Sequence, residues 1–540
     1  MKTNNKFKTM MMVTVAALAA AACTDTWDEH YGNEGGPVSD KSLLQLVEEA
    51  GDLNDFLKVL QSTHVFVNNK PTGVTYADLL ASDQTFTVWA PKDGTFNVDS
   101  LLAECATGIV GDSMCGQHFV QNHIAHYVTN STDTKSTIML NGKYLAAEPG
   151  SFEGVSYAAG RSGQPARNGL LHVMSGGLPY LYNIYEGLTT LPEYSGMGAF
   201  FKRYEKLELN EAASVASGMV DGNIVYSDSV MDRTNILFGT FQNINEEDSN
   251  FIMLVPDAQI WDKVYEEAKG YFNFGSAYKA DSLQELYAHL AVIRDLVYNR
   301  NYGCQHMADS VYSTSYYVGD EERHHIYYKP LAPGGIFSSS FVRDSMDASN
   351  GVFYNLYDWP FTPEDIYFYP VKAEAEVESL LKEYSGCSYE ATGNVARDSI
   401  SDGYLTVTAS NSQRPNWTVT FDVPNVLSGT YDVCVVTVPR RAVNPNDQIT
   451  LPCRFTGAVN YVDESGTKLT QDFEDYCIPK VYEMDTVKVG TFKVPVTSYG
   501  QPEANVQVSL TCRLSTTADR RNYYPSMIID CIYFKPSKEE

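Results

Sequence analysis

Two stretches of apolar sequence decide the fold. Residues 86–96 read FTVWAPKDGTF, residues 251–261 read FIMLVPDAQIW, and the two align without a gap. In each stretch a continuous apolar run, which predicts a buried strand, ends at a proline, Pro91 or Pro256. Proline has no backbone N–H and favours a turn, and an aromatic residue that can begin a helix follows. The chain therefore carries the same strand-and-turn unit twice.

The sequence around each unit repeats as well. Residues 168–174 and 350–356 both begin with Asn-Gly and continue as an apolar run. Asn-Gly predicts a turn before the strand, because both residues tolerate positive φ. Upstream of each unit, the spacing of apolar residues predicts an amphipathic helix, over residues 42–60 and 195–207. Order and content agree, so the sequence predicts a tandem duplication.

These motifs, in this order, resemble the fasciclin-type (FAS1) domain. That family has a helix-rich start, a first motif of the form TFTVFAP, a central His/Tyr segment and a closing NG-apolar-HV strand. The first repeat matches it at residues 85–96, 123–127 and 168–178. The resemblance implies two tandem FAS1 domains of the α+β class, at residues 39–182 and, in divergent form, 183–372. It also implies extracellular adhesion and no general enzymatic role.

The second repeat departs from the pattern in its central and closing segments. In the sequence alignment, Val297 stands where the first repeat has His126, and Tyr354 replaces His172. The role of the second repeat is therefore less defined than that of the first.

The central segment of the first repeat contains candidate binding residues. The resemblance implies that His126 and Tyr127 belong to an adhesion segment; the alternative is a hydrogen-bonded core histidine on a mainly apolar helix face. His123 and His126 are three residues apart on the expected helix, but no third ligand accompanies them at a recognisable spacing. We therefore predict no metal site.

From about residue 377 the pattern changes to short strands with alternating apolar and polar residues. Residues 506–514 place Val, Val, Leu, Cys and Leu on one face, and residues 418–423, 431–438 and 527–534 are similar. Several strands without helices between them predict an antiparallel sandwich over residues 377–540. Its Gly-Thr-Tyr strand and its closing IDCIYF strand resemble galactose-binding-like jelly rolls, a group that includes carbohydrate-binding modules and purely structural domains.

One loop of this expected sandwich is too long for a hairpin turn. Residues 515–526 separate the last two strands, and long loops carry function more often than core strands do. Sugar recognition requires an aromatic face together with planar donors and acceptors. The alternative is that the tyrosines pack over the end of the sandwich. The candidate ligand-binding residues are Arg520, Arg521, Asn522, Tyr523 and Tyr524.

The N-terminus has the features of an export signal. Three lysines precede an apolar run that is too short to span a bilayer and ends at Cys23. Residues 18–23 resemble a bacterial lipobox, which implies a signal peptide at residues 1–22 and a lipidated Cys23. Residues 23–38 are predicted to be a flexible tether, and their acidic residues resemble the surface-export signal of Bacteroidetes lipoproteins. We expect an outer-membrane, surface-exposed lipoprotein.

Composition narrows the function further. A net charge of −28 repels phosphate backbones and excludes nucleic acid as an expected partner. No phosphate-binding loop, GxSxG, HExxH or CxxC motif is present, so we predict neither a catalytic site nor a cofactor. The leading hypothesis is a protein for adhesion or for binding glycan or protein, as an accessory to a SusC/SusD-type uptake system. The alternatives are a glycan-cleaving enzyme with an unrecognised carboxylate site and a structural spacer.

Overall fold

The computed structural model describes most of the chain after the N-terminal segment. Residues 1–38, which include Cys23 and the expected tether, lie outside the described residues. The chain divides into two compact units, through Tyr180 and from Leu181. The described ranges are 39–67, 69–128, 136–211, 214–220, 223–228, 231–317, 320–393 and 403–537.

The first unit, called the first repeat here, is built on a four-stranded mixed sheet. Its strand order is β4 (Ile124–His126), β3 (Phe86–Pro91), β10 (Gly169–Met174) and β9 (Gln164–Ala166), and β3 is parallel to β10. The other strands are β1 (His64–Val67), β2 (Lys70–Thr75), β5 (Ser136–Ile138), β6 (Tyr144–Glu148), β7 (Ser151–Phe152) and β8 (Val155–Ser156). The helices are α3 (Leu43–Glu49), α4 (Asn54–Ser62), α5 (Tyr76–Ala81), α6 (Val98–Cys105) and α7 (Ile109–Cys115).

The second unit begins with an α/β portion, the second repeat, whose central sheet has the same order. Strands β16 (Val297–Asn299), β15 (Phe251–Pro256), β20 (Gly351–Leu356) and β19 (Val342–Ala348) lie side by side, with β15 parallel to β20. Its hairpins are β11 (Glu205–Leu209) with β14 (Met231–Asn235), β12 (Val215–Val220) with β13 (Asn223–Asp228), and β17 (Ser310–Tyr317) with β18 (Asp320–Tyr328). The helices are α8 (Ile184–Thr190), α9 (Ser195–Arg203), α10 (Phe238–Phe241), α11 (Ala258–Tyr271), α12 (Ala280–Ile293) and α13 (Pro363–Ile366).

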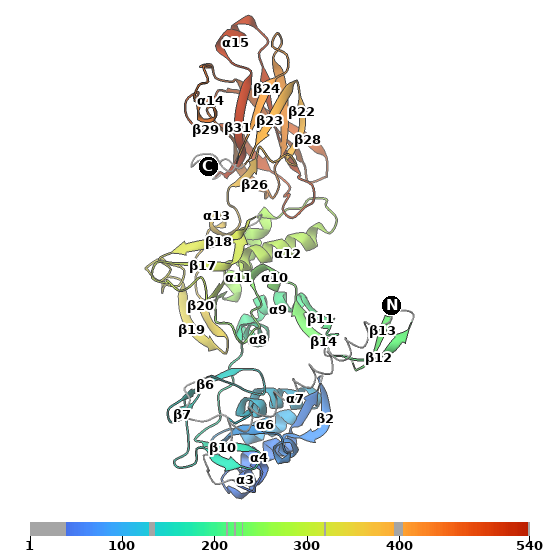
Figure 1. Ribbon diagram of the computed structural model, residues 1–540, viewed down its shortest axis with the longest axis vertical. Helices are drawn as coiled ribbons and strands as arrows, with labels where there is room; N and C mark the ends of the chain where they lie inside the picture. Colours follow the sequence, from blue (N-terminus) through green and yellow to red (C-terminus); the bar gives the residue numbers. More distant parts are fainter. Residues whose placement is uncertain are drawn as a thin grey trace, which may run out of the picture. The chain divides into compact units, whose positions relative to one another are not determined.

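The remainder of the second unit is an antiparallel β-sandwich, drawn in orange and red in Figure 1. One sheet contains β21 (Val371–Glu374), β23 (Cys387–Thr392), β24 (Tyr404–Ala409), β31 (Ser526–Pro536), β26 (Gly429–Thr437) and β29 (Asp485–Val494). The other contains β22 (Leu381–Ser385), β25 (Asn416–Asp422), β30 (Val506–Arg513), β27 (Phe455–Val462) and β28 (Lys468–Cys477). Two short helices, α14 (Arg440–Val443) and α15 (Thr517–Asn522), lie toward one end of the strands (Figure 1).

The sandwich core follows from the alternation of side chains along the strands. In β30, Val506, Val508, Leu510 and Cys512 are buried, while the residues between them are more exposed. Successive residues of a strand point to opposite faces, so this alternation buries one face against the other sheet. The six-stranded sheet also takes in β21, which pairs with β31 and lies N-terminal to residue 377.

The Asn-Gly dipeptides of both repeats lie at hairpin turns, and their asparagines are also hydrogen-bonding hubs. The Asn168 side chain accepts from the N–H of Leu43 at 2.8 Å and donates to the carbonyls of Leu80 and Ser82 at 3.0 and 2.8 Å. Gly169 has φ +146° and begins β10, and a Cβ there would lie 1.8 Å from the Phe86 carbonyl oxygen. The turn expected from the sequence is therefore confirmed, and the close approach of β3 to Gly169 is a second constraint at the same place.

The second repeat reproduces this hub contact by contact. The Asn350 side chain accepts from Ile184 N–H at 2.8 Å and donates to the carbonyls of Ile244 and Glu246 at 3.0 and 2.9 Å. Gly351 has φ +156°, and a Cβ there would lie 2.1 Å from the Phe251 carbonyl oxygen. Residues 168–174 and 350–356, which align in the sequence, thus occupy the same strand position, and their asparagines make the same contacts.

Three sequence expectations need correction. The helix expected over residues 42–60 is broken at Gly51, where φ is +72°, into α3 and α4. The helix expected over residues 195–207 ends at Arg203, and the chain continues as β11. The register of β3 with β4 and of β15 with β16 makes Asn299, not Val297, the equivalent of His126.

Two further observations concern membrane spans and cysteines. Within the described ranges, no helix has both the length and the apolar character needed to cross a bilayer. The nine cysteines in those ranges form no disulfide, and seven of them are buried. They contribute to the core as small apolar side chains.

Candidate functional site

The loop singled out in the sequence contains an ordered helical turn, α15. Thr516 is its N-cap, and its hydroxyl accepts a hydrogen bond from the N–H of Asp519 at 3.0 Å. The Asp519 carboxylate accepts in return from the N–H of Thr516, also at 3.0 Å. This reciprocal capping box satisfies backbone groups at the helix start. The loop is therefore held in one conformation by its own side chains.

Arg454, which immediately precedes β27, joins this loop to strand β28. Its guanidinium lies 4.2 Å from the ring centroid of Tyr476 and 4.7 Å from that of Tyr523. It also forms an ion pair with Asp519 at 2.9 Å. The side chain of Arg454 is 13% exposed, whereas Tyr476 is 61% exposed. Arg454 thus fixes an exposed tyrosine ring on the surface through cation–π contact.

The protonation states of this pair are fixed by their mutual contact. Burial opposes the charge of Arg454, but the hydrogen bond and charge of Asp519 outweigh it and raise the pKa of Arg454. The backbone N–H of Thr516, its hydroxyl and Arg454 lower the pKa of Asp519. Both groups therefore stay charged at neutral pH.

A second arginine lies close to the same loop. Arg440 lies 5.1 Å from the ring centroid of Tyr524, donates to the Ser526 hydroxyl at 3.0 Å and pairs with Asp447 at 3.0 Å. Its neighbour Arg441 lies 5.4 Å from the ring centroid of Tyr482, which is 62% exposed. Three arginines therefore make four cation–π contacts with tyrosines at this end of the sandwich.

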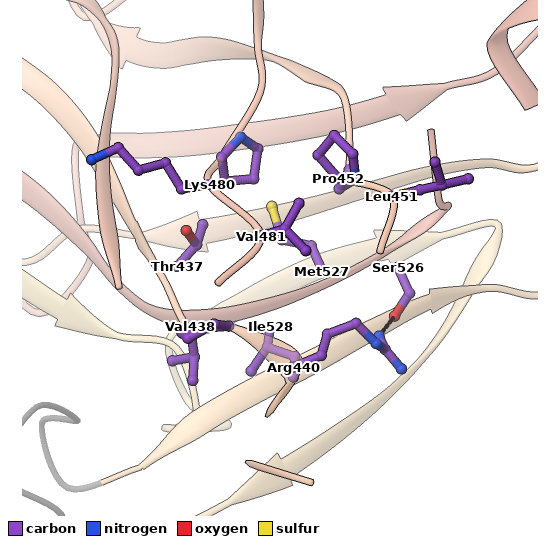
Figure 2. A pocket seen from close by; sticks show the side chains of 13 residues that line it. Thr437, Val438, Arg440, Leu451, Pro452, Lys480, Val481, Ser526, Met527 and Ile528 are labelled. Carbon is purple, nitrogen blue, oxygen red and sulfur yellow. Dashed lines mark hydrogen bonds between the residues drawn. The ribbon is translucent and has the colours of Figure 1, made fainter. Parts of the chain in front are cut away.

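A small pocket lies beside Arg440. Figure 2 shows Leu451, Pro452 and Val481 on one side of it and Val438, Ile528 and Arg440 on the other. Its volume is about 40 Å³, close to the roughly 30 Å³ that one water molecule occupies in the liquid. A sugar ring does not fit inside it. A large ligand at this end would have to lie on the surface formed by the tyrosines and arginines.

Positive charge dominates this surface. In a chain with a net charge of −28, such a local excess of positive charge is unusual. Arg521 makes no side-chain hydrogen bond or ion pair within the described ranges. The cationic side chains are Arg440, Arg441, Arg454, Lys480, Arg520 and Arg521, and the carboxylates beside them are Asp447, Glu483, Asp485 and Asp519.

The five residues selected from the sequence lie at this end but have different environments. Tyr523 and Tyr524 are half-buried and pack on arginines. Arg520 donates to the carbonyl of Gln413 at 3.1 Å, while Arg521 and Asn522 are exposed.

Sequence reasoning missed the partners that complete the surface. Arg440, Arg454, Tyr476 and Tyr482 come from four separate segments, and only the strand pairing brings them to one end. The one usable signal was the Arg-Arg pair that follows an apolar strand at residues 440–441.

The expected adhesion residues of the first repeat lie at the end of a strand, not on a helix. His126 ends β4, is exposed and stacks on Phe86 at 5.6 Å. Tyr127 follows it, is 68% exposed and has φ +66°. His123 lies in a 3-10 turn, fully buried, and therefore does not share a helix face with His126. The spacing argument for a shared metal site has no basis in this geometry.

One cluster of potential metal ligands occurs within the described part of the chain. The ligand atoms of Glu374, Asp530 and Cys531 lie within 4.8 Å of one another. Burial, followed by the nearby carboxylates, raises the pKa of the Cys531 thiol, so the sulfur stays protonated. A protonated thiol is a poor metal ligand, and two carboxylates are fewer than the six to eight oxygen ligands that Ca²⁺ takes.

Comparison with known proteins gives a limited result. No protein family and no curated protein matches the sequence. The similar solved structures are mainly β-sandwich carbohydrate-binding modules. The CBM22-1–GH10 modules of xylanase 10B from Clostridium thermocellum are 15% identical, with 32% of this chain and 28% of that chain covered and a TM-score of 0.21. The CBM22-2 xylan-binding domain of Paenibacillus barcinonensis Xyn10C is 10% identical, with 31% and 99% covered and a TM-score of 0.20.

A family 35 module from Clostridium thermocellum gives a similar result, with 13% identity, 31% and 99% covered and a TM-score of 0.19. The chain spans less than a third of the first of these structures. Similarities this low assign no ligand, and the sandwich architecture rests on the strand pairing given above.

Proposed function

We propose that this protein is a non-catalytic, lipid-anchored surface protein whose C-terminal sandwich binds an anionic glycan. The binding surface is the end that carries Arg454, Tyr476, Tyr482 and Arg521. The observation that carries the proposal is the pairing of Arg454 with the exposed ring of Tyr476. The two α/β repeats, through their resemblance to FAS1 domains, would then serve as the adhesive and spacing part of the molecule.

The Arg454–Tyr476 pair is suited to hold a sugar. A tyrosine ring offers a flat apolar face that matches the C–H face of a pyranose. Loose side chains must be ordered on binding, which costs about 0.5–1.5 kcal/mol each. Arg454 reduces that cost here, because Asp519 and Tyr523 already hold its guanidinium.

Positive charge around the pair supports an anionic ligand. Arginine binds carboxylate and sulfate oxygens in a planar, bidentate manner. Arg521 has no partner within the described residues, and Arg441 and Lys480 are exposed. An acidic glycan would form ion pairs with these side chains that a neutral glycan cannot form.

Carboxylate chemistry at the same end supports binding rather than cleavage. Glycoside hydrolysis needs a carboxylic acid whose pKa is raised so that it can donate a proton. The pKa values of Asp519 and Asp447 are instead lowered, chiefly by backbone N–H donors and also by arginines. Neither carboxyl group is suited to act as a general acid.

The lipid anchor and the partners are proposed from sequence resemblance alone. We propose that Cys23 carries the acyl chains in the outer membrane and that the protein works beside SusC/SusD-like proteins. Replacing Cys23→Ser should release the protein into the soluble fraction on cell fractionation. Continued retention in the outer membrane would refute the anchor, and full protection of the domains from protease added to intact cells would refute surface display.

Calorimetry with defined acidic glycans tests the binding surface. We expect the chain from Thr24 onward to bind tetragalacturonate or a chondroitin sulfate oligosaccharide. Tyr476→Ala and Arg521→Ala should each weaken that binding by about 1–3 kcal/mol. Tyr278→Ala is the matched control, since Tyr278 is 85% exposed and has a lysine over its ring in the second repeat. Absence of binding, or binding indifferent to both substitutions, would refute the proposal.

A further inference from the structure

A much larger cleft lies at the opposite end of the sandwich. Strand β26 has nine residues, begins at this cleft with Gly429 and ends at Thr437, which lines the small pocket beside Arg440. At about 3.3 Å per residue, the two ends are roughly 26 Å apart. The cleft has a volume of about 1030 Å³. Ligand sites typically measure about 300–1,000 Å³, so this cleft can accept several sugar rings.

Both the second repeat and the sandwich form the walls. Glu364 and Phe368 come from α13 and the residues after it, and Tyr271 ends α11. Tyr461 and Gln471 come from β27 and β28 of the sandwich. A ligand in the cleft would touch both parts at once.

Asn273 holds these walls together. Its backbone N–H donates to the Ser428 hydroxyl at 3.1 Å, and its side-chain amide donates to Glu464 at 2.9 Å and to the Pro495 carbonyl at 3.1 Å. Gly429 packs so close to Phe368 that a Cβ would lie 2.7 Å from the ring. The cleft is therefore formed before any ligand arrives.

Aromatic rings line both walls. Tyr271 packs against Phe368 with ring centroids 4.6 Å apart, and Tyr461 packs against Phe492 at 4.9 Å. The two phenylalanines are buried, whereas the two tyrosines are half-buried. Each tyrosine is thus supported from behind and presents part of its ring to the cleft, as a platform for a sugar requires.

Two exposed polar side chains line the cleft. Glu364 and Gln471 make no side-chain hydrogen bond or ion pair within the described ranges, and they lie on different walls. Their carboxylate and amide groups are suited to accept from and donate to hydroxyl groups. By contrast, Asp463 and Glu464 already accept hydrogen bonds from Ser465 and Asn273.

The charge of this cleft is opposite to that of the arginine end. Glu364, Asp463 and Glu464 face a single cation of the lining, Lys493. Carboxylates in excess repel acidic sugars but hydrogen-bond readily to neutral hydroxyl groups. We propose that the cleft is a second binding site, which takes a neutral oligosaccharide across the junction of the second repeat and the sandwich. This inference rests on the proposed function in one respect, that the sandwich recognises glycans.

Calorimetry with neutral probes tests the cleft. The chain from Thr24 onward should bind xylohexaose or maltohexaose. Glu364→Ala and Gln471→Ala should each weaken that binding about tenfold, which corresponds to one lost polar contact. Both residues are exposed, so the variants should fold normally. Glu474→Ala, an exposed carboxylate on β28 outside the cleft, is the charge-matched control and should bind as the parent does.

The outcomes separate the two sites. The cleft proposal is supported if the Glu364→Ala and Gln471→Ala variants bind the hexaose about tenfold more weakly and retain tetragalacturonate binding. The cleft proposal is wrong if neither neutral hexaose binds. It is also wrong if hexaose binding is weakened by Tyr476→Ala and unchanged by both cleft variants. In those two cases tetragalacturonate binding still tests the arginine end independently.

Discussion

The two α/β repeats share a framework but not the side chains that it carries. Both sheets have the same strand order, and Asn168 and Asn350 make the same three side-chain hydrogen bonds. On the edge strands β4 and β16 the equivalent residues are His126 in the first repeat and Asn299 in the second. The repeats share the strand order and the asparagine that holds the sheet to a helix, whereas the side chains at the position of His126 differ.

The divergence extends into the core. Buried His123 donates to the Phe119 carbonyl at 2.7 Å and accepts from the N–H of Leu178 at 2.9 Å. The second repeat has Leu296 at this position, which needs no such partners. The second repeat instead contacts the sandwich, for example through Arg294, which donates to the Tyr499 hydroxyl at 3.0 Å. We therefore expect adhesion, if retained, to belong to the first repeat.

The largest predicted effect tests the shared framework. Asn168→Ala and Asn350→Ala each remove three hydrogen bonds and leave buried backbone groups without partners. Each unsatisfied group costs about 1–3 kcal/mol, so each variant should lose about 3–5 kcal/mol of stability. Hydrogen exchange followed by mass spectrometry on the whole chain should show the loss in β3 and β10 for the first variant and in β15 and β20 for the second.

A matched control is Asn54→Ala, whose side chain makes exposed hydrogen bonds in the first repeat. It should change protection little. If either hub variant costs less than about 1 kcal/mol, the two asparagines are not equivalent supports of the sheet.

An effect of intermediate size is a loss of stability at acidic pH, which His123 should cause in the first repeat and which Leu296 cannot cause in the second. Burial lowers the pKa of His123 from 6.5 to about 4, although its bond to the Phe119 carbonyl opposes this. In the unfolded chain His123 is therefore protonated below about pH 6.5, whereas in the folded chain it is protonated only below about pH 4. The contribution of neutral His123 to the free energy of unfolding is fully present above pH 6.5. It falls by about 3 kcal/mol as the pH decreases to 4.

Exchange protection of the first repeat, corrected for intrinsic rates, should fall over this pH range. In His123→Leu, which copies the second repeat, the slope between pH 6.5 and 4 should become shallower even if stability at pH 7 is reduced. An unchanged slope would show that other groups cause the acid sensitivity.

Sequence reasoning found the repeats because strands β3 and β15 are buried on both faces and read as continuous apolar runs. It misjudged the central segment, because three strand residues that end in His126 are too few to show a period. It located the loop of Tyr523 but not Arg454 or Tyr476, since cross-strand packing has no signature along the chain. The cleft was unpredictable for the same reason, as its walls come from two folds.

The smallest predicted effect concerns Tyr127, where the repeats differ in backbone strain. Its N–H donates to the Thr85 carbonyl at 3.0 Å, and the equivalent Arg300 donates to Asn250 at 2.7 Å. Only Tyr127 of this pair has a positive φ, at +66°, which costs a non-glycine residue about 1 kcal/mol. Tyr127→Gly would relieve that strain, but glycine loses about 0.5–1 kcal/mol more entropy on folding.

These two terms nearly cancel, and the exposed ring loses little burial, so Tyr127→Gly should change stability by less than about 0.5 kcal/mol. Urea denaturation of the parent and the variant, monitored by exchange protection of β3, measures the difference. A loss above about 1.5 kcal/mol would mean that the ring supports the fold. A neutral result would leave the strained, exposed tyrosine without a structural purpose, and it is at such positions that binding residues concentrate.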